Sequence, residues 1–397
     1  MPPQYIKRVR ICPPLSCGFC AITKVMPLFA VIVIVFQALV FFGHWFLYNT
    51  AARFLDLHGT VAVKIVFALL SVSFVSASVL LIRYNKTLLN ILFTLAATWL
   101  GVFYFLVWGC FFCWIALWLH RALGICGWGK APWAAVIFAL GLAVSVFSVL
   151  NARHVRTRQI SVSLPGLPAA WKGRTALWTC DLHLGPVRNI AFARRIARKI
   201  KQLNPDILFI GGDLYDGTSG DPVRLVEPFA GIKPPLGTWF ITGNHEEFSP
   251  RAKQRFINAV SGAGIYVLDN DAVSIDGINI AGVDYMDTYT AEKYRAVLKK
   301  MDLKRDCPLI LLKHSPMYPE IAMEEGASLQ LSGHTHGGQI FPAGLITGMV
   351  YNGFDNGLKR LEGLNVYTSS GTGTWGPPMR FGTVPEIVLI RFHQAPP

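Results

Sequence analysis

Four long apolar runs occupy the first 150 residues, and they constrain the fold of this chain more than any other feature. They cover residues 25–48, 60–82, 88–119 and 132–150. A helix needs about 20 predominantly apolar residues to cross a bilayer, so each run predicts one membrane-spanning helix. The first run is too long for a cleavable signal peptide and lacks a small-residue cleavage site before polar sequence. We therefore expect a multi-pass membrane protein.

The third run has two interpretations. As one helix, its 32 residues would be about 48 Å long, whereas the hydrocarbon core of a bilayer is about 30 Å thick. Such a helix can tilt and protrude, or the run can break near Gly101 or Gly109 into a hairpin that adds a fifth span. We favour a single helix because a hairpin at this place would have no polar turn.

The charge of the chain follows its membrane topology. The total is +14, but residues 1–150 hold ten Lys/Arg and a single acidic residue, and the rest of the chain is close to balance. This is loop charge around membrane spans, so nucleic acid is not an expected partner. Four spans put nine basic residues on one side and three on the other, which predicts that the N-terminus and the polar domain face the cytoplasm. The nine are Lys7, Arg8, Arg10, Lys24, Arg83, Lys86, Arg153, Arg156 and Arg158, and the three are Arg53, Arg121 and Lys130.

Two further segments flank the membrane region. Residues 1–24 form a basic tail that contains Cys17-x-x-Cys20. Palmitoylation of these thiols is favoured over a zinc or redox site, because a first span follows and no second ligand pair accompanies them. Residues 151–171 are basic and then Pro/Gly-punctuated, which is typical of an interfacial link.

Residues 172–397 have the pattern of an α/β domain. Short apolar runs such as "TALWT", "DILFI" and "LILL" predict buried strands, and "NIAFARRIARKIKQL" has apolar residues at helical spacing. Polar residues follow the predicted strands directly. In α/β sheets, residues at the carboxyl ends of strands converge on one site. The residues concerned are Asp181, His183, Asp213, Asn244, His245, Asp284, His314, His334 and His336.

Seven of these residues suit two metal ions. Asp181, His183 and His336 could hold one cation, and Asn244, His314 and His334 could hold a second. Asp213 can bridge the two, because a carboxylate has two oxygens and its charge offsets the repulsion between two dications. Mixed nitrogen and oxygen ligation suits Mn, Fe, Zn, Co or Ni. Two such cations about 3.5–4 Å apart would bind a phosphate and acidify a water molecule.

The ordered set Asp-x-His, Gly-Asp, Gly-Asn-His-Glu, His and Gly-His-Thr-His resembles the calcineurin-like metallophosphoesterase superfamily. The resemblance implies a four-layer αββα sandwich and a bridging hydroxide that attacks phosphorus. It implies the same metal ligands, with His245 stabilising the transition state or protonating the leaving oxygen and Glu246 orienting it. Cys180 departs from the pattern, since serine is commoner before the aspartate, and a thiol here could be sensitive to oxidation.

The function that these features favour is a membrane-anchored, binuclear-metal phosphoesterase that hydrolyses phosphate mono- or diesters. Arg380 is a candidate contact to the substrate phosphate, because a guanidinium binds phosphate as a bidentate fork. A phospholipid or lipid-linked substrate is favoured, since the bilayer raises the local concentration of headgroups. One alternative is a tethered binding module without turnover. Another is a transporter with an appended hydrolase, since His44, Lys64 and Asn90 lie within spans.

Overall fold

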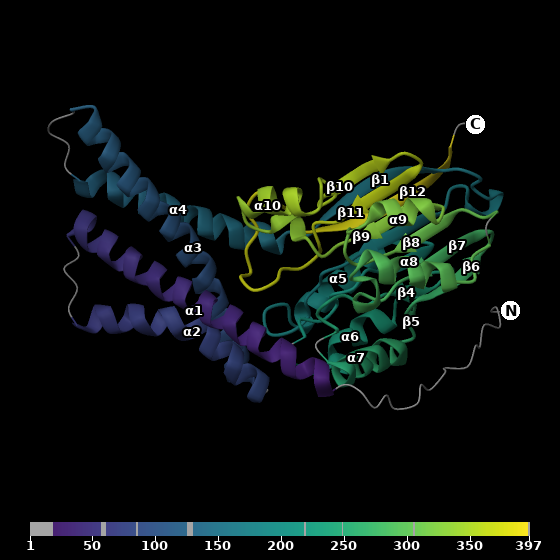
Figure 1. Ribbon diagram of the computed structural model, residues 1–397, viewed down its shortest axis with the longest axis horizontal. Helices are drawn as coiled ribbons and strands as arrows, with labels where there is room; N and C mark the ends of the chain where they lie inside the picture. The colour runs from purple at the N-terminus through teal and green to yellow at the C-terminus, as the bar shows by residue number, and fades with distance from the viewer. Residues whose placement is uncertain are drawn as a thin grey trace.

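The computed structural model describes residues 19–56, 61–84, 86–124, 130–217, 220–247, 249–304 and 306–395. Four apolar helices come first and an α/β domain follows, so both predicted regions are confirmed (Figure 1). Cys17 lies outside the described residues, and the side chain of Cys20 is not described. The four helices are α1 (Phe19–Leu55), α2 (Val61–Arg83), α3 (Thr87–Ala122) and α4 (Lys130–Arg153).

All four helices are long and apolar enough to cross a membrane. The third is one continuous helix of 36 residues that runs through Gly101 and Gly109. Gly109 faces Phe138 of α4, while Gly141 of α4 faces the backbone of Phe105. Both glycines let α3 and α4 approach closely, as small residues do in membrane helix pairs. The prediction of a single third helix is therefore confirmed.

The buried His44 has a structural environment in this bundle. Its Nδ1 donates to the carbonyl of Val40 at 2.8 Å, and its Nε2 accepts from the indole Nε1 of Trp99 at 2.9 Å. The ring also stacks on Phe103, with ring centroids 4.0 Å apart. The Nδ1 bond is thus internal to α1, whereas the Trp99 bond and the stacking on Phe103 hold α1 against α3.

The α/β domain consists of two six-stranded sheets. The first has the order β1-β12-β2-β3-β4-β5 and the second β10-β11-β9-β8-β7-β6. Strands of the first sheet are β1 (Arg156–Leu164), β2 (Thr175–Thr179), β3 (Ile207–Ile210), β4 (Thr238–Phe240), β5 (Tyr266–Val267) and β12 (Glu386–Gln394). Strands of the second are β6 (Asp271–Ile275), β7 (Ile278–Gly282), β8 (Leu309–Leu312), β9 (Ala327–Ser332), β10 (Gly357–Leu361) and β11 (Leu364–Thr368). The helices are α5 (Ile190–Leu203), α6 (Pro222–Ala230), α7 (Pro250–Gly262), α8 (Ala291–Lys300), α9 (Pro319–Glu324) and α10 (Ala343–Val350).

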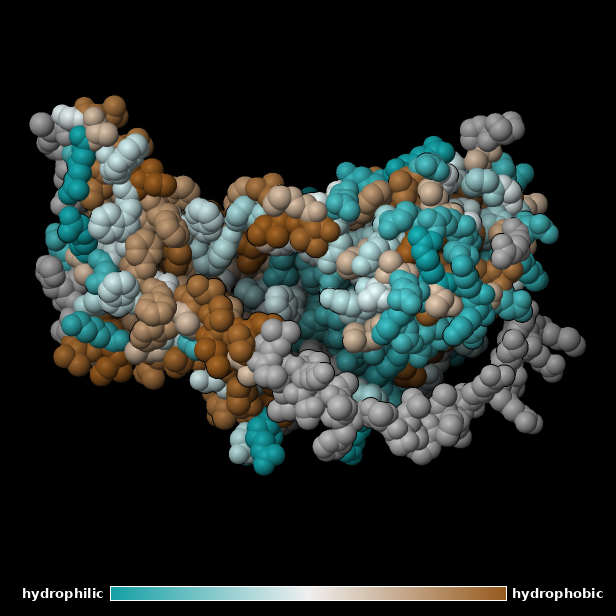
Figure 2. Space-filling model, viewed as in Figure 1, coloured by the Kyte–Doolittle hydropathy of each residue, from teal (hydrophilic) through white to brown (hydrophobic). Residues whose placement is uncertain are grey.

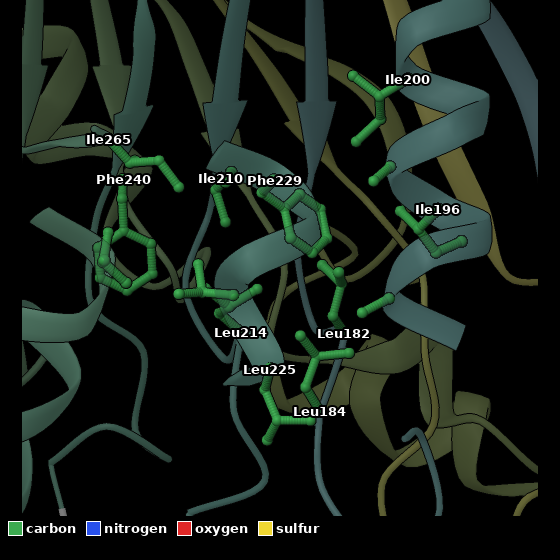
Figure 3. Close-up of a cluster of buried hydrophobic side chains, with 14 of the residues drawn as sticks. Leu182, Leu184, Ile196, Ile200, Ile210, Leu214, Leu225, Phe229, Phe240 and Ile265 are labelled. Atoms are coloured by element: carbon green, nitrogen blue, oxygen red, sulfur yellow. The ribbon is translucent and has the colours of Figure 1, made fainter. Parts of the chain in front are cut away.

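Three apolar clusters divide the domain into four layers. Side chains of α5, α6 and α7 pack on one face of the first sheet, where Ile196, Phe229 and Ile210 meet (Figure 3). A second cluster, which includes Trp178 and Ile310, fills the space between the two sheets. A third lies between the second sheet and helices α8 and α9. This arrangement is the predicted αββα sandwich.

Residues 151–171 correct one expectation. The sequence predicts an interfacial link here, but Arg156–Leu164 forms β1, which pairs in parallel with β12 from Arg156↔Glu386 to Leu164↔Gln394. The first residues of β1 carry exposed basic side chains, which hide its strand character, while Val162 and Leu164 are buried against the core. The last membrane helix is therefore followed within a few residues by an edge strand of the first sheet.

Candidate metal centre

The candidate metal ligands meet where strands of both sheets end. β2, β3 and β4 are parallel neighbours in the first sheet, and β8 and β9 are parallel neighbours in the second. Their carboxyl ends therefore lie at the same edge of the sandwich. Backbone hydrogen bonds fasten the loops that follow: Asp181 N donates to the Gly212 carbonyl at 3.0 Å, and Gly333 N to the His314 carbonyl at 2.8 Å.

The backbone at these strand ends is in an uncommon conformation. Five of the candidate ligands have φ between +47° and +70°, a region that side chains other than glycine seldom occupy. Each such residue costs on the order of 1–3 kcal/mol, and residues of this kind cluster at functional sites. The turned backbone directs side chains from separate strands into one space. The five are Asp181, His183, Asp213, His334 and His336.

Gly212 shows why the loops are glycine-rich. Its φ is +84°, and a Cβ at this position would lie 2.7 Å from the backbone nitrogen of Gly243 and 2.8 Å from Nδ1 of His314. Only glycine therefore allows the β3 and β4 loops and the His314 ring to approach one another.

One group of ligand atoms comprises Asp181, His183 and His336, all buried, with ligand atoms within 4.8 Å of one another. Nε2 of His183 and Nε2 of His336 are 3.0 Å apart. The backbone nitrogen of His334 donates to the Asp181 carboxylate at 3.0 Å, which fixes the carboxylate orientation.

A second group comprises Asp213, His314 and His334. Nδ1 of His314 donates to the Gly211 carbonyl at 2.7 Å, so Nε2 points toward Oδ2 of Asp213 at 3.3 Å. Nδ1 of His334 and Oδ1 of Asn244 are 2.7 Å apart, which places Asn244 at this group. Asp213 also belongs to a third group with His183 and His245, so it lies between the first two.

Burial controls the protonation of these side chains. It lowers the pKa of His183 and of His336 well below the ordinary value and lowers the pKa of His334 to about 3, which leaves these imidazoles neutral. Burial raises the pKa of Asp181 to about 6, although nearby His314 opposes the shift. For His314 burial lowers the pKa, but the carboxylates of Asp213 and Asp181 overcome it and raise the pKa to about 9.

This set of donors fits divalent cations. Neutral imidazoles and carboxylates are the forms that bind metals, and His183, His334 and His336 are already neutral in this largely buried space. His314 has to release a proton when a cation binds, because the nearby carboxylates raise its pKa to about 9. Among the described residues, the buried Nδ1 of His183 has no hydrogen-bond partner. The geometry therefore offers two neighbouring groups of ligands, and Oδ2 of Asp213 in the second lies 3.8 Å from Nε2 of His183 in the first.

His245 lies at the edge of this centre. Its Nδ1 donates to the backbone carbonyl of Asp216 at 3.0 Å, and its ring packs edge-on against His183 with centroids 4.6 Å apart. The family resemblance implies that Glu246 orients this ring. The Glu246 carboxylate instead accepts hydrogen bonds from the backbone nitrogens of Asp213, Tyr215 and Gly243 at 2.8–3.1 Å. Glu246 thus holds the loop that carries Asp213, and the carbonyl of residue 216 orients His245.

Asp216 has a larger part in the site than the sequence indicates. Besides orienting His245, it places Oδ1 3.7 Å from Nδ1 of His183. In the sequence, a structural role in the turn after the strand is enough to explain an aspartate at position 216. Its position three residues after Asp213 is the only available signal, and that spacing is equally typical of ordinary loops.

Arg380 is fully buried behind His336. Its guanidinium donates to the His336 carbonyl at 2.8 Å and to the Gly373 carbonyl at 2.7 Å, and Nη2 lies 3.1 Å from Nδ1 of His336. These contacts direct its donors to His336 and the surrounding backbone. The predicted contact with a substrate phosphate therefore requires a movement that this arrangement does not show.

Cys180 lies in the sheet core beside Asp181. Its side chain is fully buried, and burial together with the neighbouring Asp181 raises the thiol pKa well above its ordinary value. Thiolates, not thiols, react readily with oxidants, so this environment opposes the expected sensitivity to oxidation.

Comparison with known proteins identifies the family. The model of the calcineurin-like phosphoesterase domain matches residues 176–338. An uncharacterized metallophosphoesterase of Aquifex aeolicus is 32% identical over 260 residues, which is 63% of this chain and 97% of that protein. The chain belongs to the calcineurin-like phosphoesterase family.

Relatives within this family include membrane proteins. A Danio rerio protein named transmembrane protein with metallophosphoesterase domain is 32% identical over 270 residues, or 64% of this chain. The aligned region spans 61% of the length of that relative. Among solved structures, the crystal structure of TT1561 of Thermus thermophilus is 13% identical, with 50% of this chain and 89% of that chain covered and a TM-score of 0.35.

Proposed function

We propose that this chain is a membrane-anchored phosphoesterase that binds two divalent cations and hydrolyses phosphate mono- or diesters. The observation that carries this proposal is the meeting of seven candidate ligand side chains, Asp213 and six others, at the ends of five strands, most of them buried. Family membership supports the reaction class. Manganese, iron, zinc, cobalt or nickel suits the mixed nitrogen and oxygen ligands.

The residues of this chain have separate roles in the proposed reaction. Asp181, His183 and His336 hold one cation, and Asn244, His314 and His334 hold the other, with Asp213 shared. When bound, the pair of cations neutralises phosphate oxygens and acidifies a water molecule for attack on phosphorus. Glu246 and Arg380 hold the loops that carry Asp213 and His336.

His245 is the proposed proton donor. Because its Nδ1 is used by the carbonyl of Asp216, only Nε2 can exchange a proton with a substrate. The ring lies beside His183 and so at the edge of the proposed metal pair. It is thus placed to give its proton to the leaving oxygen.

A phospholipid or lipid-linked phosphoester is the proposed substrate class. The four apolar helices keep the centre at a bilayer surface, where lipid headgroups are abundant. Four spans and the excess of basic residues near the domain support a cytoplasmic orientation of the centre.

The first test is metal-dependent hydrolysis by the full chain in detergent, stripped of metal and reloaded with Mn, Zn, Fe, Co, Ni or Mg. The substrates are p-nitrophenyl phosphate, its bis ester and a set of phospholipids. Asp213→Ala should remove turnover and lower the bound metal below two per chain. His245→Ala should keep both metals but lose about 10²–10⁴-fold in rate, which is the usual contribution of a general acid.

Asp276→Ala is the matched control, because Asp276 is an exposed carboxylate that pairs with Arg174 away from the centre. It should retain both metals and full turnover. A folded wild-type chain that binds no metal would contradict the proposal and favour the tethered binding module. Cleavage of soluble esters with no activity on any lipid would contradict only the substrate class.

A further inference from the structure

The surface of α10 is unusual for a helix of a water-soluble domain. None of its eight residues is buried, and none carries a charge. The side chains of Leu345, Ile346, Met349 and Val350 are each about 60–70% exposed. A helix packed against a domain normally buries its apolar face, and a contiguous exposed apolar patch marks a site of interaction. Figure 2 shows this patch as hydrophobic surface on a domain whose visible face is mostly hydrophilic.

The patch adjoins the membrane helices. The Tyr104 hydroxyl of α3 donates to the carbonyl of Phe341, two residues before α10, at 2.8 Å. Phe105 packs edge-on against Phe381, with ring centroids 5.5 Å apart, and Phe341 N in turn donates to the Phe381 carbonyl. Phe341 itself is 54% exposed. In Figure 1, α10 lies beside the end of α4 that enters the domain. The apolar surface of α10 is therefore continuous with that of the spanning helices.

The length of α3 places this contact at a bilayer boundary. A hydrocarbon core of about 30 Å corresponds to about 20 helical residues. Counted back from Arg121 at the far end of α3, about 20 residues reach the turn that contains Gly101 and Tyr104. Tyrosine is enriched at the membrane–water interface. On the side of Tyr104 nearer the domain, Phe147 and Leu150 of α4 still present exposed apolar side chains. α10 thus lies at the depth of the leaflet surface.

The other side of α10 leads to the metal centre. Tyr351, directly after the helix, has its ring centroid 6.2 Å from that of His334. Thr347 donates to the carboxylate of Asp355 at 2.9 Å, and Thr335, between the two histidines, donates to the Asp355 carbonyl at 2.6 Å. The candidate ligands therefore lie directly behind the exposed apolar face of α10.

We propose that α10 and Phe341 insert into the headgroup region of the leaflet nearest the domain, and that the partner of this surface is the lipid bilayer. An apolar helix face lying in the interface binds in proportion to its buried apolar area. The contact holds the metal centre close to lipid headgroups, since Tyr351 directly after α10 packs near His334. This last step rests on the proposed function, whereas the membrane contact itself does not.

The test is photo-crosslinking of the full chain in nanodiscs of phosphatidylcholine and phosphatidylserine. The photoreactive p-benzoylphenylalanine replaces Ile346 in one sample and Met349 in a second, which guards against misfolding of either variant. Val223 is the matched control position, because it is an apolar side chain with 62% exposure on α6, away from α10 in Figure 1. Intact-mass measurement should show lipid adducts at positions 346 and 349 and none at position 223.

Two outcomes would overturn the proposal. Adducts with the mass of a second chain would identify the α10 surface as an interface between copies. Equal lipid labelling at positions 346 and 223 would show no preferred contact. The measurement needs neither metal nor turnover, so its result is independent of whether the phosphoesterase activity is found.

Discussion

The Arg380 side chain connects the last strand region to a candidate metal ligand. It lies behind His336, contacts both the carbonyl and the ring of that residue, and has no exposed surface. A partner that hydrogen-bonds a ligating histidine fixes the orientation of its ring and so tunes metal binding. We therefore interpret Arg380 as a positioning residue for His336.

Arg380→Met should weaken metal binding by about 10–100-fold, as loss of such a partner typically does. With metal at saturating concentration, KM for bis-p-nitrophenyl phosphate should change little. Chelator competition measures the first quantity and steady-state kinetics the second. Arg380→Lys keeps the charge but not the planar fork, and should be intermediate. A raised KM with unchanged metal affinity would instead support direct contact with substrate.

The sequence revealed the candidate ligands but not the residues that hold them. Histidines and aspartates directly after apolar runs are recognisable, because their chemistry is unusual at a strand end. Asp216 acts largely through its carbonyl, and Glu246 through three backbone amides. Such contacts depend on where loops meet in space, which residue type and spacing do not reveal.

At the scale of elements, a cluster of charged side chains around the buried Asp284 holds α7 to the end of β7. Lys253 of α7 pairs with Asp284 and lies 3.2 Å from Glu247 and 3.4 Å from Asp269. Burial alone would raise the pKa of Asp284, but its hydrogen bond with Glu247 and the charge of Lys253 lower it to about 2. The pKa of Glu247 is raised to about 8, because burial and the adjacent Asp284 disfavour a second negative charge.

Lys253→Met should destabilise the domain by about 1.5–3 kcal/mol, the usual contribution of a hydrogen bond to a charged group. Since the pKa of Asp284 is lower in the folded state, the stability it adds is fully present above its ordinary pKa near 4 and is lost as the pH falls toward 2. Thermal unfolding of the full chain at pH 7 should show a lower Tm for the variant. The difference from wild type should shrink at pH 3, and a constant difference would contradict this account.

Half-exposed strands were among the elements that the sequence did not reveal, as was the mostly buried β11. The predicted strands are buried on both faces and read as continuous apolar runs, as central strands do. β1 has the burial of an edge strand and begins with "RTRQ", and β10 reads "GLKRL" with three exposed residues. β1 becomes a strand because it pairs with β12, which is distant in the sequence. β10 becomes a strand because it pairs with β11, although much of β10 is polar.

At the scale of the whole molecule, the α/β domain is fastened to the membrane helices. The Asn151 amide donates to the carbonyls of Arg380 and Thr383 at 3.0 and 2.9 Å, and Arg380 N donates to the Ser148 carbonyl at 3.0 Å. Arg188 reaches the Ala152 carbonyl at 3.2 Å. The segment that carries Arg380, and through it His336, is thus bonded directly to α4. We infer that the bilayer fixes the orientation of the metal centre.

This arrangement makes the topology testable. Four spans place both chain termini on one side and the connection between α3 and α4 on the other, and the basic residues near the domain favour the cytoplasm for the termini. An epitope tag after residue 397 should therefore be digested by protease only after vesicles sealed right side out are opened. The same tag inserted between α3 and α4 is the matched control, and it should be digested in sealed vesicles. If the C-terminal tag is digested and the inserted tag is protected, the domain faces outward. In that case the substrate has to be sought in the outer leaflet, because Asn151 and Ser148 hold the centre against whichever leaflet the domain faces.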